Sequence, residues 1–274
     1  MSHGPVDRAI ADWGVPGADL ALGAVCGGDV VWRVGDRDAR FDLASVTKPL
    51  VAWATLVAVE EGTVHLGSPA GPAGSTVRHL LAHASGMPLD GPAPIAAPGV
   101  RRIYSNRGFE LLGGHLAERS DIGWSEYASA AIAGPLTMTA TTFGSSAAHG
   151  AHSTVNDVLR FALEVASPTL LDPTTVQEAC TEQFPGLRGV LPGIGAFDPN
   201  PWGLGVEIRA TKSPHWTGTR CSSRTVGHFG AAGTFWWFDP DRDLAVVGLG
   251  RRPFGPWALE AWPTVSDAVI EMLA

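Results

Sequence analysis

The 274-residue chain is predicted to adopt a mixed α/β (α+β) fold, with one antiparallel sheet built from both ends of the chain and helices inserted between them. Strand-like apolar runs occur early, at 18–26 and 30–34. They return only late, at 202–210, 233–238 and 244–249. Between these two sets the patterns are helical, so the two termini are expected to supply the strands of one sheet.

The predicted domain boundaries follow from the loops. Residues 67–75 are rich in Gly, Pro and Ala, which is typical of a linker or crossing loop. We therefore expect 1–66 and 195–274 to form the α/β part with its antiparallel sheet, and 67–194 to form an all-helical part.

Two short turns support antiparallel pairing of the strands. Gly27-Gly28-Asp29 joins the first two apolar runs and is a hairpin signal. Asp239-Pro240-Asp241-Arg242-Asp243 joins the last two. Its carboxylate spacing is reminiscent of a calcium loop, but the glycine and terminal glutamate of such a loop are absent. A hairpin turn is the favoured interpretation.

Helical patterns fill the rest of the chain. Helices are expected near both ends, at 5–13 and 256–273. In the middle they are expected at 76–83, 107–119, 124–133, 154–165 and 174–181, with loops at 88–98 and 186–199.

Composition excludes several classes of function. A net charge of −8 without a basic run argues against nucleic acid as a partner. No apolar run approaches the roughly 20 residues of a membrane span, and the N-terminal segment lacks a signal-peptide core. Cys26, Cys180 and Cys221 are widely spaced and show no metal-ligand register. These features predict a cytoplasmic protein with reduced thiols, no membrane partner, and no metal or other cofactor.

The segment 41–61 is predicted to be one long helix that carries Ser45 and Lys48 near its start. Residues at i and i+3 share a helix face, so the hydroxyl and the amine are expected to lie within reach of each other. From Pro49 to Val59 every residue except Thr55 is apolar, which is typical of a buried helix. A buried lysine has a lowered pKa unless it is paired, and such a lysine can activate a serine nucleophile. Ser45 as a simple N-cap and Lys48 as a surface residue are the alternatives.

Two further segments contain candidate site residues. Tyr104-Ser105-Asn106 lies at a loop-to-helix junction, where it could supply a proton carrier and an amide donor or simply cap the helix. The glycine-rich segment 227–234 contains His228 and precedes an apolar strand. It could bring backbone N–H groups close to a ligand, or it could be a turn with a core histidine.

Other signals are weaker. His79 and His83 stand at i and i+4, but the glutamate of a metalloprotease helix is absent, so they are interpreted as structural. No Gly-x-Ser-x-Gly elbow occurs. Cys221 stays open as a cysteine nucleophile, although no motif surrounds it.

The order of the three segments resembles a known superfamily. Ser45-x-x-Lys48, Tyr104-x-Asn106 and His228-x-Gly230 are similar to the three motifs of serine β-lactamases and penicillin-binding proteins. The resemblance is to the branch with class C β-lactamases, family VIII carboxylesterases and D-alanyl-D-alanine carboxypeptidases. The segments 79–86 and 202–205 also resemble family segments.

This resemblance implies a β-lactamase/transpeptidase-like fold with the active site in the cleft between the α/β and helical parts. It implies that Ser45 is the nucleophile and becomes acylated. Lys48 and Tyr104 would share the general-base work, with Tyr104 passing a proton to the leaving group.

The same resemblance implies the residues that bind substrate. Asn106 would bond the acyl side, and His228 would occupy the place of the lysine in the family's Lys-Thr-Gly, followed by Gly230. The backbone N–H groups of Ser45 and Ala231 would form the oxyanion hole.

One departure bears on the substrate. His228 is expected to be neutral near pH 7 and Phe229 has no hydroxyl, so a substrate carboxylate would lose its charge-assisted bonds. We therefore expect a serine hydrolase acting on small esters or amides. The alternatives are β-lactamase or D-Ala-D-Ala peptidase activity from the same site, and a non-catalytic binding protein that kept the fold.

Overall fold

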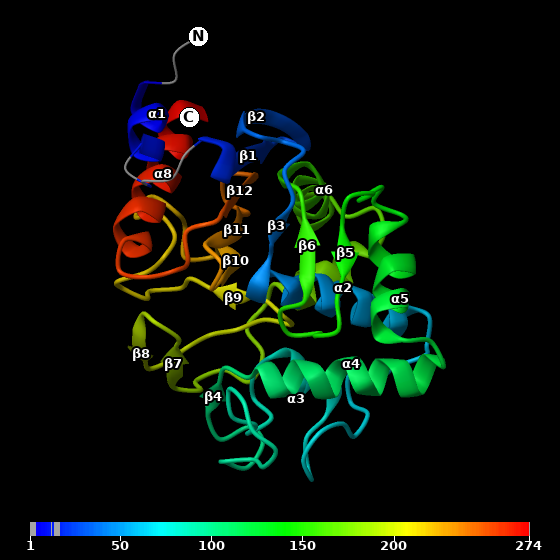
Figure 1. Ribbon diagram of the computed structural model, residues 1–274. Coiled ribbons are helices and arrows are strands. Elements are labelled where there is room, and N and C mark those ends of the chain that lie inside the picture. The colour runs from blue at the N-terminus through cyan, green and yellow to red at the C-terminus, as the bar shows by residue number, and fades with distance from the viewer. Residues whose placement is uncertain (1–3, 12, 14–16, 274) are drawn as a thin grey trace.

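A six-stranded antiparallel sheet forms the centre of the structure, which is a computed structural model that describes residues 4–11, 13 and 17–273. Its strand order is β2-β1-β12-β11-β10-β9 (Figure 1). The strands are β1 (Leu20–Cys26), β2 (Asp29–Gly35), β9 (Glu207–Ile208), β10 (Val226–Gly230), β11 (Thr234–Asp239) and β12 (Leu244–Gly250). The two strands from the start of the chain and the four from its end lie side by side in one sheet, joined where β1 pairs with β12, which confirms the predicted fold class.

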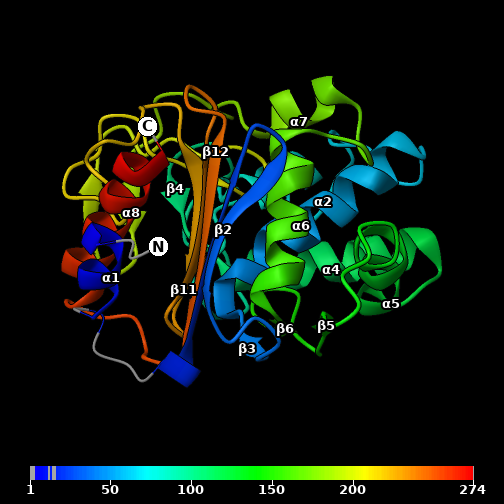
Figure 2. The same cartoon turned by 90° about the horizontal axis from the view of Figure 1, so that it is seen from above.

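Helices cover both faces of this sheet. Figure 2 shows α1 (Gly4–Ala11) and α8 (Ala258–Leu273) on one face and α6 (Val155–Ala166) on the other. Strands β11 and β12 are buried along their whole length, as expected for strands covered on both sides. Along β11, Trp236 packs with the α6 side and Phe235 and Trp237 pack with the α8 side, which is the alternation of a β-strand.

The central helix α2 (Thr47–Glu60) is buried almost throughout, as its apolar sequence predicts. The prediction of one helix from residue 41 is wrong at its start. Residues Phe41–Asp42 form strand β3, which pairs with β6 (Ala151–Ser153), and Ala44–Val46 form a 3₁₀ turn. Ala44 has a φ of 44°, a conformation that a continuing α-helix does not allow.

The expected helices of the middle segment are all present. They are α3 (Val77–Leu81), α4 (Asn106–Ser120), α5 (Trp124–Ala128) with a π-helical turn at Ser129–Ala133, α6, and α7 (Pro173–Ala179). Side-chain caps begin several of them: Ser105 accepts from the Gly108 N–H, and Thr154 accepts from the Asp157 N–H. Helix α6 contacts β1, β11 and β12, although it lies within 67–194. The exact domain boundaries stay a prediction.

The short strands were not predicted. Two small sheets occur, β3-β6-β5 and β4-β7-β8, and the second places a hairpin in the expected loop 186–199. Their further strands are β4 (Arg102–Ile103), β5 (Thr142–Phe143), β7 (Gly189–Leu191) and β8 (Gly195–Phe197). Strand β10 was expected only as a glycine-rich segment, and the strand expected at 202–210 is reduced to β9. The strands of the two small sheets are only two or three residues long, which is too short to show a period in the sequence, so distant partners decide them.

Within the described residues, no helix is long and apolar enough to span a bilayer.

Candidate active site

Ser45 lies in the 3₁₀ turn that directly precedes α2. Two hydrogen bonds hold the backbone just before Ser45. The Ala44 N–H donates to Asp42 Oδ1 at 2.8 Å, and the Thr234 hydroxyl donates to the Leu43 carbonyl at 2.9 Å. The positive φ of Ala44 costs of order 1–3 kcal/mol, and such backbone is common where a reactive side chain must be presented.

Lys48 lies one turn further on and is fully buried. Its Nζ is 3.2 Å from Ser45 Oγ, as the i, i+3 spacing predicts. It also donates to Asn106 Oδ1 at 2.8 Å and to the Ala148 carbonyl at 2.9 Å. Helix α2, the start of α4 and the 144–150 turn therefore meet at one amine.

Burial lowers the pKa of Lys48 to about 7, although the carboxylates of Glu110 and Asp90 oppose this shift. Near neutral pH, a substantial fraction of the amine is therefore uncharged. A neutral amine has two N–H donors and one lone pair. Because Asn106 and Ala148 accept the two donors, the lone pair is left for the Ser45 hydroxyl. The geometry suits proton transfer from Ser45 to Lys48.

Tyr104 flanks the same serine. A side-chain hydrogen bond links it to Ser45, and the Lys48 nitrogen lies 4.7 Å from its ring centroid. Burial raises the pKa of Tyr104 well above its ordinary value. The phenol therefore keeps its proton at neutral pH and acts as a donor, so Lys48 is the better suited of the two expected bases to accept a proton.

Asn106 is the first residue of α4, and both the oxygen and the nitrogen of its side-chain amide form hydrogen bonds. Its oxygen accepts from Lys48, and its Nδ2 donates to Asp90 Oδ1 at 3.3 Å. The residue faces the pocket of Ser45, so it can both position Lys48 and meet a substrate. The sequence predicted only substrate binding for Asn106 and not its hydrogen bond to Lys48.

His228 is buried on β10, with ring centroids 5.8 Å from Tyr104 and 5.5 Å from Trp202. Its Nδ1 lies 2.8 Å from the Phe229 carbonyl oxygen, which can only accept, so Nδ1 carries the hydrogen. Burial and then the charge of Lys48 lower the pKa of His228 to about 3. The ring is therefore neutral and its Nε2, which has no partner among the described residues, is an acceptor.

The two other predicted residues of this segment differ in position. Ala231 faces the pocket of Ser45. Gly230 does not face it; a Cβ at Gly230 would collide with the Leu43 carbonyl oxygen and the Thr234 hydroxyl. Gly230 therefore lets β10 approach the backbone that precedes Ser45.

These residues surround one pocket of about 270 Å³. Ser45, Tyr104, Asn106, His228 and Ala231 line it, so five of the seven predicted side chains or backbone positions share one cavity. Lys48 does not line this pocket, but its amine contacts the Ser45 hydroxyl, which does. Apolar side chains form the rest of the wall: Leu89, Leu191, Pro192, Trp202, Phe229 and Phe254.

Sequence reasoning missed two supporting residues, Glu110 and Glu207. Glu110 accepts hydrogen bonds from Ser146 and from the Ala147 and Ala148 N–H groups, which holds the carbonyl that faces Lys48. Glu207 borders the pocket, and its buried carboxylate is bound by Lys212 and His215. Glu110 stands four residues after Asn106, and this was the only local hint of its role.

The weaker sequence candidates are placed elsewhere. His83 is buried behind Tyr104, with ring centroids 4.5 Å apart, and accepts from the Ser105 N–H. His79 caps α3 through Thr76, so both histidines have structural contacts. Burial raises the pKa of Cys221 to about 12, which disfavours it as a nucleophile. In the described part of the chain no group of three or more His, Cys, Asp or Glu could hold a metal ion.

An antiparallel sheet from both termini and a Ser-x-x-Lys helix start beside a tyrosine define a protein of the serine β-lactamase and penicillin-binding protein type. The chain belongs to the β-lactamase family, whose model matches residues 8–269. This confirms the resemblance seen in the sequence.

Solved structures agree. A β-lactamase from Mycobacterium bovis is 48% identical, with a TM-score of 0.94 over 97% of this chain and 98% of the other. EstCE1, described as a hydrolase with promiscuous acyltransferase activity, is 18% identical, with a TM-score of 0.77 over 97% and 96% of the two chains. A penicillin-binding protein homologue from Pyrococcus abyssi, described as octameric, is 20% identical, with a TM-score of 0.77 over 100% and 77%. The last two show the fold alone. No curated protein sequence gives a significant match.

Proposed function

We propose that the protein is a serine hydrolase that forms an acyl-enzyme at Ser45 and acts on small esters or amides. The observation that carries this proposal is the Lys48 amine, whose two donors are taken by Asn106 and Ala148 and whose remaining position faces the Ser45 hydroxyl. A lysine held in this way, with a pKa of about 7, is a general base at neutral pH.

In the proposed first step the Ser45 hydroxyl gives its proton to Lys48 while its oxygen attacks the substrate carbonyl carbon. The N–H groups of Ser45 and Ala231 stabilise the oxyanion. Tyr104 then gives its proton to the leaving oxygen or nitrogen as the bond from the carbonyl carbon to that atom breaks, and recovers a proton from the Lys48 ammonium. Water cleaves the resulting ester of Ser45 in the reverse sense and releases the acid.

His228 favours substrates that are uncharged beside the scissile bond. Its Nε2 is a neutral acceptor, so it repels a carboxylate and can accept from a substrate N–H or O–H. This supports ester or amide hydrolysis over β-lactam hydrolysis, because a penicillin carries a carboxylate near the bond that is cut.

A second candidate function is β-lactam or D-Ala-D-Ala peptide hydrolysis at the same serine. The specific observation in its favour is the 48% identity to a structure described as a β-lactamase.

The test compares wild type with Ser45→Ala on a p-nitrophenyl ester series from acetate to hexanoate and on nitrocefin. Ser129→Ala, a change at an exposed helical serine, is the matched control. Ester turnover that disappears only in Ser45→Ala, with an acyl adduct on a Ser45 peptide by mass spectrometry, supports the proposal. Nitrocefin turnover that exceeds ester turnover favours the second candidate. Ester turnover that survives in Ser45→Ala refutes both.

A further inference from the structure

A second cavity opens beside the pocket of Ser45 and is larger, at about 650 Å³. The two cavities share Leu89, Tyr104 and Pro192 in their walls, so they are continuous along the face of Tyr104. Both volumes together lie in the range in which proteins bind small ligands. We call the larger cavity the Tyr104 groove.

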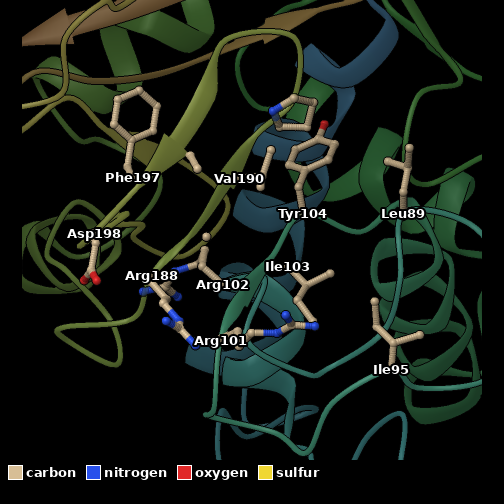
Figure 3. Close-up of a pocket in the computed structure, with 13 residues that line it drawn as sticks. Leu89, Ile95, Arg101, Arg102, Ile103, Tyr104, Arg188, Val190, Phe197 and Asp198 are labelled. Carbon is tan, nitrogen blue, oxygen red and sulfur yellow. The ribbon is translucent and has the colours of Figure 1, made fainter.

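The walls of the Tyr104 groove are apolar and open to water. Leu89, Ile95 and Val190 line it, although they are 46%, 58% and 58% exposed. Figure 3 shows Leu89 and Ile95 on one side and Val190 and Phe197 on the opposite side. Large exposed apolar side chains gathered around one groove indicate a binding surface.

The far end of the groove is positively charged. Figure 3 shows the Tyr104 hydroxyl pointing away from Arg101 and Arg188, which lie toward the other end. Both arginines are exposed, and neither side chain has a hydrogen bond or ion pair within the described residues. Asp198 also lines the groove, but no ion pair joins it to either arginine. This end of the groove therefore has two unpaired arginines and one aspartate, a local excess of positive charge on a chain whose net charge is −8.

A third arginine, Arg102, also lines the groove next to Arg101. Arg102 is buried, and its guanidinium donates to the carbonyls of Asn200 at 3.1 Å and Gln183 at 2.6 Å. Its hydrogen bonds therefore go to backbone carbonyls, and its charge also interacts with the Glu182 carboxylate. It anchors the strand that presents Arg101, and it leaves Arg101 and Arg188 available to a ligand.

Resting on the proposed function, we propose that the Tyr104 groove binds the distal part of the ester or amide substrate, an apolar chain that ends in an anionic group, most simply a carboxylate. The scissile bond then lies at Ser45, the apolar chain runs past Tyr104 between Leu89 and Val190, and the anion meets Arg101 and Arg188. The neutral acceptor His228 excludes an anion beside the scissile bond, whereas the arginines attract one at the far end.

The test uses p-nitrophenyl monoesters of dicarboxylic acids from succinate to sebacate. Each is compared with the neutral alkanoate ester of equal length and with an ester that ends in a trimethylammonium group. In wild type, kcat/KM should favour the anionic ester only once the chain is long enough to reach the arginines, and the cationic ester should be the poorest. Arg101→Gln/Arg188→Gln should reduce the anionic-to-neutral ratio by roughly fivefold to tenfold, and added salt should reduce it in wild type.

Arg33→Gln is the matched control and should keep the wild-type ratio. It changes an exposed arginine on the edge strand β2, which does not line the groove. A parallel arm uses acetate esters of ω-hydroxy acids against simple alkyl acetates, followed by acid release. A preference in the first arm places the groove on the acyl side, and a preference in the second places it on the alcohol side. Each supports the proposal.

The proposal is overturned if neither arm shows a preference at low salt, or if the preference is the same in the double variant. In that case Ser45-dependent hydrolysis of the neutral esters would still support the proposed function. If wild type hydrolyses no ester through Ser45, the proposed function and this inference both fail.

Discussion

Lys48 Nζ lies 2.8 Å from Asn106 Oδ1, although 58 residues separate them in the chain. This bond joins the start of the buried helix α2 to the start of α4. It also occupies one donor of the amine, while Ala148 takes another. With both donors of the neutral amine occupied, Ser45 is the partner left for its lone pair.

The rate of acylation should depend on pH through Lys48. Only its neutral form accepts a proton, and burial lowers its pKa to about 7. As pH rises through 7 the charged fraction falls, so kcat/KM for p-nitrophenyl butyrate should rise and level off. A profile between pH 5.5 and 8.5, corrected for spontaneous hydrolysis, tests this. A flat profile would contradict the assignment of Lys48 as the base.

Glu110→Gln should move this acid limb to lower pH. The Glu110 carboxylate raises the pKa of Lys48 against the larger effect of burial, so removing its charge favours the neutral amine. Glutamine keeps an oxygen that can accept from the Ala148 N–H. Glu118→Gln, at an exposed position further along α4, should leave the profile unchanged. An acid limb that moves upward in Glu110→Gln would refute the electrostatic argument.

Lys48→Met and Lys48→Arg separate a proton acceptor from a mere positive charge. Methionine suits a buried site, so the fold should persist while kcat falls by about 10²–10⁴-fold. Arginine keeps the charge but does not deprotonate, so it should be equally inactive. Circular dichroism checks the fold of each variant. Restored turnover in Lys48→Arg would show that charge alone is sufficient.

Gly230→Ala should damage both stability and activity. A Cβ there collides with backbone at Leu43 and with Thr234, so β10 or the Ser45 turn must shift. We expect a loss of about 1–3 kcal/mol in the free energy of unfolding. Gly114→Ala is the control, since nothing lies within 4 Å of a Cβ at that exposed position in α4. Denaturant unfolding of the two variants should give opposite signs, because alanine favours a helix over glycine.

Glu207→Gln should destabilise the protein far more than a surface charge deletion. Burial by itself raises the pKa of Glu207, but the charges and hydrogen bonds of His215 and Lys212 outweigh it and lower the pKa below its usual value. Removing one partner of a buried pair leaves Lys212 uncompensated, which costs about 3–5 kcal/mol. Arg224→Gln breaks an exposed pair with Asp241 and should cost within about 1 kcal/mol. Similar Tm values for the two variants would contradict this reasoning.

The long elements were predictable because their patterns are local. Apolar runs located β1, β2, β11 and β12, and the expected helices are all present. Strands β3 to β8 were not predicted because each is only two or three residues long. Each is defined by a distant partner, as Phe41 is by Ser153. The strand expected at 202–210 is wrong for most of its length, because only Glu207–Ile208 pair with β10 and Trp202 forms a single isolated bridge with Glu207.

By itself, the sequence determined the hydroxyl and amine pair and the burial of its helix, because i, i+3 spacing and an apolar run act within one element. Only the tertiary structure decided the state of that pair. The acceptors of the Lys48 amine come from Asn106 and Ala148, 58 and 100 residues away, and the hydrogen on His228 is fixed by one carbonyl. The Tyr104 groove likewise exists only where 89–104 meets 188–198. Proton affinity and ligand shape depend on what surrounds a group in space, and only folding brings those surroundings together.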